Sequence, residues 1–130
     1  MKTELLYLVW TAVLCLLLWL PYIGVRAVKH GLAADEYRMP RNLPVPDWAH
    51  RAHRAHLNLV ENLAPFAALV LICHAIGLSN SVTAGAAAVF FWSRVAHAAV
   101  HIAGTPFVRT PIFSIGWIAQ LVIAWQILAR

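Results

Sequence analysis

A row of polar side chains at helical spacing is the feature of this sequence that can support chemistry. Its polar members are Arg51, Arg54, Asn58 and Glu61, and Pro65 continues the same spacing of three, four, three and four positions. At about 100° per residue, such a series falls on one face of a helix. Arginine binds anions, asparagine forms neutral hydrogen bonds and glutamate binds cations. The face therefore suits a small ligand with carboxylates and an amino group, such as an amino acid or a small peptide.

A second polar row lies further along the chain. Arg94, His97 and His101 are separated by three and four positions, so they also share a helix face. Arg109 follows after a short interval and adds another positive charge. If the two rows face each other, they line one polar cavity with a cationic mouth.

The same residues permit other interpretations. Buried ion pairs between the rows would hold helices together without any ligand. Arginines near the ends of an apolar helix can also extend their charged groups to the water interface, which would account for Arg26 and Arg51. Histidines at helical spacing can ligate zinc, and the chain has two such sets: His97 with His101, and His50 with His53 and His56. No cysteine or carboxylate cluster completes either set, so we expect no metal.

The helices that position these residues must cross a membrane. The chain is 62% hydrophobic and 12% charged over 130 residues, whereas soluble domains have roughly 25% charged residues. Leu5 to Val25 carries no charge over 21 residues, which is long enough to span the hydrocarbon core. No Ala-x-Ala cleavage site follows, so we interpret this run as a retained helix. The net charge of +5 comes from arginines beside apolar runs, which indicates a membrane flank and not a nucleic-acid partner.

We predict a single all-α domain over residues 1–130, an integral membrane bundle of four helices at about 5–29, 47–76, 82–103 and 111–128. A polar connection, 33–48, separates the first two helices and contains three prolines. Asp47 is a suitable N-cap for the second helix, and Pro65 should kink it. Small residues crowd the third helix, which indicates close packing within the chain or against another copy.

The distribution of Lys and Arg predicts the orientation. The first connection and its flanks hold most of them, the second has none, and the third has Arg109. By the positive-inside rule the first and third connections face the cytoplasm, and both termini lie on the periplasmic side of a bacterial inner membrane.

The two rows also resemble the signature of a known family. The run Arg51–Phe66, together with Arg94–His101 and Arg109–Phe113, is similar to that of the MAPEG family, the membrane-associated proteins in eicosanoid and glutathione metabolism. The short length resembles the bacterial members. The resemblance implies a homotrimer of four-helix subunits, with membrane lipid around it and glutathione bound as a co-substrate between neighbouring subunits. It also implies a lipophilic small-molecule substrate.

The resemblance implies a role for each polar residue. Arg54, Asn58 and Glu61 match positions that hold the carboxylates and amino group of glutathione, and Arg51 opens the same motif. The remaining matches, by position, are Arg26 (an arginine contributed by the adjacent subunit), Arg94, His97 and His101 (ligand contacts on the third helix) and Arg109 (the catalytic cation that stabilises the glutathione thiolate).

Three positions depart from the family pattern. Leu57 stands where some relatives have another glutathione-binding arginine, His101 where a tyrosine is usual, and Phe113 where some members have a tyrosine.

The sequence leaves three interpretations of the function. The first is a glutathione transferase or peroxidase. The second is a non-enzymatic membrane protein on the same scaffold that binds a lipid or another small anion. The third, a small transporter or assembly subunit, is less favoured because the chain lacks the internal repeat typical of transporters.

Overall fold

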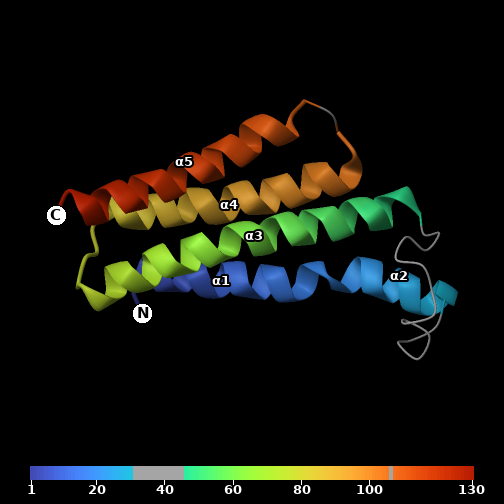
Figure 1. Ribbon diagram of the computed structural model, residues 1–130, viewed down its shortest axis with the longest axis horizontal. Helices are drawn as coiled ribbons and strands as arrows, with labels where there is room; N and C mark the ends of the chain where they lie inside the picture. Colours follow the sequence, from blue (N-terminus) through green and yellow to red (C-terminus); the bar gives the residue numbers. More distant parts are fainter. Residues whose placement is uncertain (31–45, 106) are drawn as a thin grey trace.

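The protein is a long, narrow bundle of helices. The computed structural model describes residues 1–30, 46–105 and 107–130, and most of the expected polar connection, 33–48, lies outside these residues. The helices are α1 (Thr3–Leu18), α2 (Leu20–His30), α3 (Asp47–Ala75), α4 (Ser81–Ala103) and α5 (Arg109–Leu128). Both termini and the α3–α4 turn lie at one end, the termini end. The far end of α2 and the α4–α5 connection lie at the other, the α2 end (Figure 1).

Four spans in the described chain are long and apolar enough to cross a membrane: Thr3–Lys29, Asp47–Ala75, Ser81–Ala103 and Arg109–Leu128. The first span combines α1 and α2, which follow each other along one line of the bundle (Figure 1). The prediction of an all-α, four-helix membrane bundle is confirmed.

The first span is interrupted where the sequence predicted one continuous helix. α1 ends at Leu18, Trp19 forms a turn, and α2 begins at Leu20. Pro21 explains the interruption, because proline has no N–H to donate and its ring crowds the carbonyl four residues earlier, that of Leu17.

The helix starts differ slightly from the expected positions. Asp47 is not the N-cap of α3, because Pro46 occupies that position and provides no side-chain cap. Asp47 instead lies in the first turn, where its negative charge is stabilised by the helix dipole. At the start of α4, the Asn80 side chain accepts from the backbone N–H of Thr83 at 2.9 Å, and Thr83 Oγ1 accepts from the Asn80 N–H at 3.0 Å. α3 continues through Pro65 to Ala75.

The main apolar core joins α3, α4 and α5 toward the termini end. Phe66 and Phe90 are fully buried, and their rings stack with centroids 4.0 Å apart. Val70 and Cys73 of α3 and Ile123 of α5 belong to the same core. This core fixes the register of α3 against α4, and therefore the position of the polar rows on the other half of each helix.

Candidate functional site

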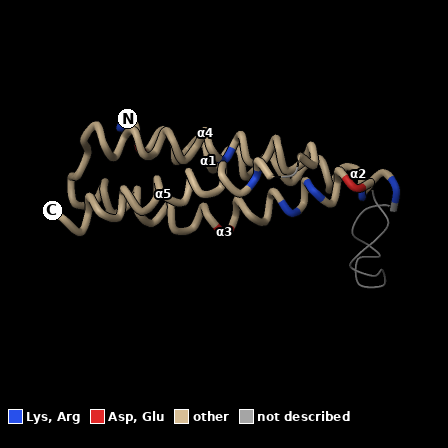
Figure 2. The backbone as a smooth tube through the Cα atoms, turned by 90° about the horizontal axis from the view of Figure 1, so that it is seen from above, with Lys and Arg blue, Asp and Glu red and all other residues tan. Residues whose placement is uncertain are grey.

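Positive charge is concentrated in one half of the molecule. Figure 2 shows most Lys and Arg positions of the described chain in the half that contains α2, on several neighbouring helices. Like charges held close together raise the energy of the folded protein unless an anion or water compensates for them. The concentration therefore marks the α2 end as a candidate site for an anionic ligand.

A hydrogen-bonded network connects three helices below the charged end. The buried Arg94 donates from Nη2 to Asn58 Oδ1 and lies 3.5 Å from His97 Nδ1. Asn62 Nδ2 donates to the Asn58 carbonyl oxygen at 2.8 Å, and Gln120 Nε2 approaches Asn62 Oδ1 at 3.5 Å. Arg94, His97 and Asn58 therefore come together as the spacing suggested.

Asn62 and Gln120 belong to this network but were not identified from the sequence. Gln120 is buried in α5, and Thr110 to Ala129 carries no charge. A polar side chain inside such an apolar run is itself a signal, because an unpaired amide within a membrane is costly. Asn62 lies four positions after Asn58, so the same helical spacing could also have placed it in the row.

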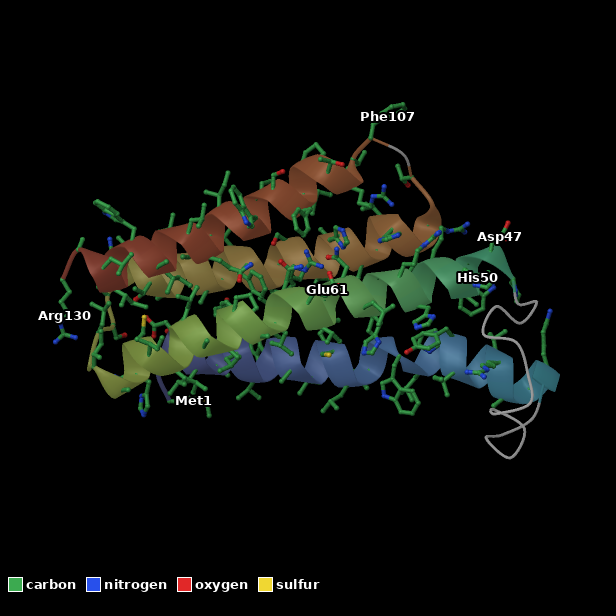
Figure 3. All side chains as sticks on the ribbon, viewed as in Figure 1. Met1, Asp47, His50, Glu61, Phe107 and Arg130 are labelled. Atoms are coloured by element: carbon green, nitrogen blue, oxygen red, sulfur yellow. The ribbon has the colours of Figure 1, made fainter. Side chains whose placement is uncertain are left out.

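A pocket of about 290 Å³ opens at the α2 end above the network. It is formed by the start of α3, the end of α4 and the start of α5. Its described lining residues are Arg51, Arg54, His101, Gly104, Thr105, Phe107, Arg109 and Thr110. Three of these are arginines and none is acidic. The exposed Phe107 projects from the α4–α5 connection at the rim (Figure 3).

Arg51 fixes the wall of this pocket. Its Nε donates to the Ile102 carbonyl oxygen at 2.8 Å, near the end of α4. Gly104 ends α4 with a φ of 75°, a left-handed conformation that favours glycine. A Cβ at Gly104 would also lie 3.1 Å from Arg51 Nε. Glycine at this position therefore allows the Arg51 guanidinium to approach the helix end.

The contact between Arg109 and His101 determines which histidine nitrogen is protonated. Arg109 Nη1 lies 3.5 Å from His101 Nε2. A guanidinium can only donate hydrogen bonds, so in neutral His101 the Nε2 atom accepts and Nδ1 carries the proton. His101 Nδ1 is buried and has no partner within the described chain, and the same is true of Arg94 Nε. Each unpaired N–H costs about 1–3 kcal/mol, and an acceptor group of a ligand would remove that cost.

The two apolar departures from the family pattern have different positions. Phe113 lies against the network, with its ring centroid 5.5 Å from the Arg94 guanidinium carbon and 6.0 Å from the His97 ring. Its ring supplies a cation–π contact where a hydroxyl would supply a hydrogen bond. Leu57 is 46% exposed on the outside of α3 and does not line the pocket.

Two residues of the predicted site lie apart from the pocket. Glu61 is exposed near the middle of the bundle's long axis (Figure 3), and it has no hydrogen bond or ion pair within the described chain. Arg26 lies on α2, one turn after Tyr22, whose ring stacks on His53. A single chain therefore collects Arg51, Arg54, His101 and Arg109 in the pocket, with Asn58, Arg94 and His97 beneath it, and leaves Glu61 and Arg26 outside.

The histidines do not form a metal centre in the described chain. No group of three or more His, Cys, Asp or Glu side chains is placed there to hold a metal ion. The His97 and His101 rings lie 5.4 Å apart and perpendicular. His56 contacts Tyr22 and Cys15.

A comparison with family models identifies the chain. The model of the MAPEG family matches residues 7–129, which include all three motifs and parts of all four membrane spans. The chain belongs to the MAPEG family. Searches of the curated proteins and of the solved structures each return no match. MAPEG proteins include glutathione transferases and peroxidases.

Proposed function

We propose that this MAPEG protein is a membrane-bound, glutathione-dependent transferase or peroxidase. The observation that supports it best is the pocket at the α2 end, where three arginines meet without an acidic neighbour among the described lining residues. Two buried N–H groups, His101 Nδ1 at the pocket and Arg94 Nε beneath it, also have no acceptor within the described chain. Glutathione carries two carboxylates and a thiol that can ionise, so it can satisfy such a site.

The charge and position of each pocket arginine suggest its role. Arg54, with Arg51 fixed beside it, attracts carboxylates at the pocket wall. Arg109 stabilises a thiolate, because a nearby cation lowers the pKa of a thiol from its usual value of about 8.5. Arginine remains charged at all relevant pH values, so it performs this role without titrating.

Bound glutathione would supply the nucleophilic thiolate. The second substrate would be a lipophilic electrophile or peroxide that arrives from the bilayer, since the outer surfaces of the four spans carry many exposed apolar side chains. The chain's contribution is to bind glutathione, orient its sulfur and hold it ionised.

The assembly we propose is a homotrimer. Glu61 is exposed within a membrane span, which is costly for a charge that faces lipid. A neighbouring subunit that covers Glu61 and contributes Arg26 would remove that cost and complete the site. Native mass spectrometry in mild detergent should show three chains. A clean monomer or dimer would contradict both the assembly and the shared site.

The orientation we propose places the α2 end in the cytoplasm and both termini in the periplasm of a bacterial inner membrane. Both termini lie at one end of the bundle, and Lys and Arg gather at the other (Figures 1 and 2). A reporter fused after Arg130 should behave as periplasmic. Cytoplasmic activity of that fusion would reverse the orientation.

Calorimetry with detergent-purified protein tests the proposed ligand. The protein should bind glutathione at or below millimolar concentration, and Arg54→Gln should weaken binding by about tenfold or more, because a charge-assisted hydrogen bond contributes about 1.5–3 kcal/mol. Arg130→Gln removes the same charge at the opposite end and should leave binding unchanged (Figure 3). Absence of binding at millimolar glutathione would contradict the proposal.

The alternative is a non-enzymatic membrane protein that binds a lipid or another small anion. Phe113 favours it, because an apolar ring lies against Arg94 where some members have a tyrosine. This alternative predicts that inorganic phosphate or an anionic lipid binds in the same calorimetric experiment while glutathione does not. It also predicts that Arg54→Gln weakens that binding.

A further inference from the structure

A second cluster of reactive side chains lies on another side of α3, where α3 contacts α1 and α2. Cys15 Sγ is 3.8 Å from His56 Nε2, and His56 Nδ1 is 3.2 Å from Tyr22 Oη. The Tyr22 ring also stacks on His53, with centroids 4.3 Å apart and an interplanar angle of 21°. None of these residues lines the arginine pocket.

This arrangement is that of a nucleophile, a base and a group that holds the base. If His56 Nε2 accepts a hydrogen bond from the Cys15 thiol, His56 Nδ1 carries the ring proton and donates a hydrogen bond to Tyr22 Oη. After the thiol proton moves to Nε2, the imidazolium donates to the thiolate from Nε2 and still donates to Tyr22 from Nδ1. Proton transfer therefore requires no rearrangement of hydrogen bonds, and stacking on His53 keeps the tyrosine in place.

The two cysteines of the chain differ in these respects. Cys73 is 1% exposed in the main core, and its thiol has no hydrogen-bond partner within the described chain. Cys15 is half-buried and contacts an imidazole. A thiolate is the reactive form of cysteine, and apolar surroundings alone disfavour it. The imidazole contact and the partial exposure therefore distinguish Cys15 from an inert buried thiol.

We propose that Cys15 is a modification site for lipophilic electrophiles with an activated double bond, such as α,β-unsaturated carbonyl compounds. The thiolate sulfur forms a bond to the β carbon, and the electrons of the double bond move toward the carbonyl as an enolate. The α carbon then takes the proton that His56 received from the thiol. No bond is oxidised or reduced, and no other reactant is needed.

The preference for a lipophilic reagent follows from the surroundings of Cys15. The thiol lies within the first membrane span, and the small core between α1, α3 and α4 to which Cys15 belongs is otherwise entirely apolar, with Leu14, Leu18 and Leu59 among its members. A reagent dissolved in the bilayer reaches this position more easily than a charged one. The site is separate from the arginine pocket, so the proposal does not depend on glutathione binding.

N-ethylmaleimide, an apolar α,β-unsaturated imide, is a suitable probe for the full-length protein in detergent or vesicles. Intact-protein mass spectrometry gives the alkylation rate of each thiol, with Cys73→Ser leaving Cys15 and Cys15→Ser leaving Cys73. Cys15 should react faster than Cys73. In the Cys73→Ser background, His56→Gln should slow alkylation by about a hundredfold, the lower end of what a positioned general base contributes. His74→Gln, an exposed histidine elsewhere on α3, should change nothing.

The pH profile separates base assistance from simple exposure. An ordinary thiol loses reactivity tenfold for each pH unit below its pKa of about 8.5. The rate at Cys15 should fall less steeply, and His56→Gln should restore the steep profile. Tyr22→Phe keeps the stacked ring and tests the same cluster if the His56 variant fails to fold; it should slow alkylation severalfold. Equal rates for both cysteines, or an unchanged rate in a folded His56 or Tyr22 variant, would overturn the proposal.

Discussion

The two ends of the bundle treat buried polar groups in opposite ways. At the termini end, the buried Glu4 carboxylate accepts from Thr83 Oγ1 at 2.7 Å and from Ser79 Oγ at 3.1 Å. In the half of the bundle toward the α2 end, His101 Nδ1 at the pocket and Arg94 Nε beneath it are buried with no partner in the described chain. Buried polar groups in folded proteins are almost always paired.

This difference suggests a structural role for the termini end and a ligand-binding role for the α2 end. The paired carboxylate joins α1 to the start of α4 beside a close-packed aromatic core, so that end needs nothing more for its stability. One unpaired donor belongs to His101, which lines the pocket of three arginines, and the other to Arg94 beneath that pocket. A ligand with acceptor groups at the α2 end, as proposed above, would account for this arrangement. Substitutions at the two ends should therefore affect different measurements.

The largest stability effect should come from the main core. Phe90→Ala removes a fully buried ring stacked on Phe66, which typically costs about 3–5 kcal/mol. The thermal unfolding midpoint in detergent should fall strongly. Trp92 lies on the same helix and its side chain is 57% exposed. Trp92→Ala is therefore the matched control and should have little effect. Similar losses for both would mean that the stacked rings do not form the stable part of the bundle.

A smaller effect is expected where α4 and α5 approach closely. A Cβ at Gly116 would lie 2.6 Å from Ser93 Oγ, whereas a Cβ at Gly85 would meet nothing within 4 Å. Gly116→Ala should therefore destabilise the protein by about 1–3 kcal/mol through overpacking. Gly85→Ala should stabilise it by up to about 1 kcal/mol, because alanine favours the helix. Thermal unfolding of the two variants measures the contrast, and the same sign for both would contradict it.

Glu61 should affect binding without affecting stability. It has no partner in the described chain, so Glu61→Gln should change the stability of the ligand-free protein by no more than about 0.5 kcal/mol. Glutathione affinity should fall about tenfold if the carboxylate binds the ligand's amino group. A loss of about 3–5 kcal/mol without ligand would instead show that Glu61 belongs to a buried ion pair in the assembly.

Hydrophobicity and charge placement were sufficient to predict the fold. The starts of α3 and α4 lie within one residue of the expected positions, and that of α5 within two. The apolar character of these spans and the proline and glycine residues between them predict where each helix begins, so these bounds need no knowledge of packing. The interruption at Trp19 was not predicted, because the apolar run continues across Pro21 and obscures the missing backbone donor.

The candidate site was predictable only in part. Helical spacing placed Asn58, Arg94 and His97 together, because residues on one face of each helix meet where two helices cross. The roles of Asn62 and Gln120 depend on how α5 is rotated against α3, which spacing within one helix does not determine. The positions of Glu61 and Arg26 relative to the pocket depend on contacts beyond one chain, so their functional roles stay predictions.

The most direct test of the account concerns Arg109. A lysine keeps the positive charge at the start of α5 but lacks the planar guanidinium that can hold an anion at a fixed place. With glutathione bound near neutral pH, the wild-type protein should show the ultraviolet difference absorbance of a thiolate. Arg109→Lys should still bind glutathione by calorimetry, because Arg54 and Asn58 remain, yet lose that absorbance and most turnover of a model electrophile. A lysine variant with full thiolate absorbance and full turnover would contradict the assignment of Arg109 as the activating group.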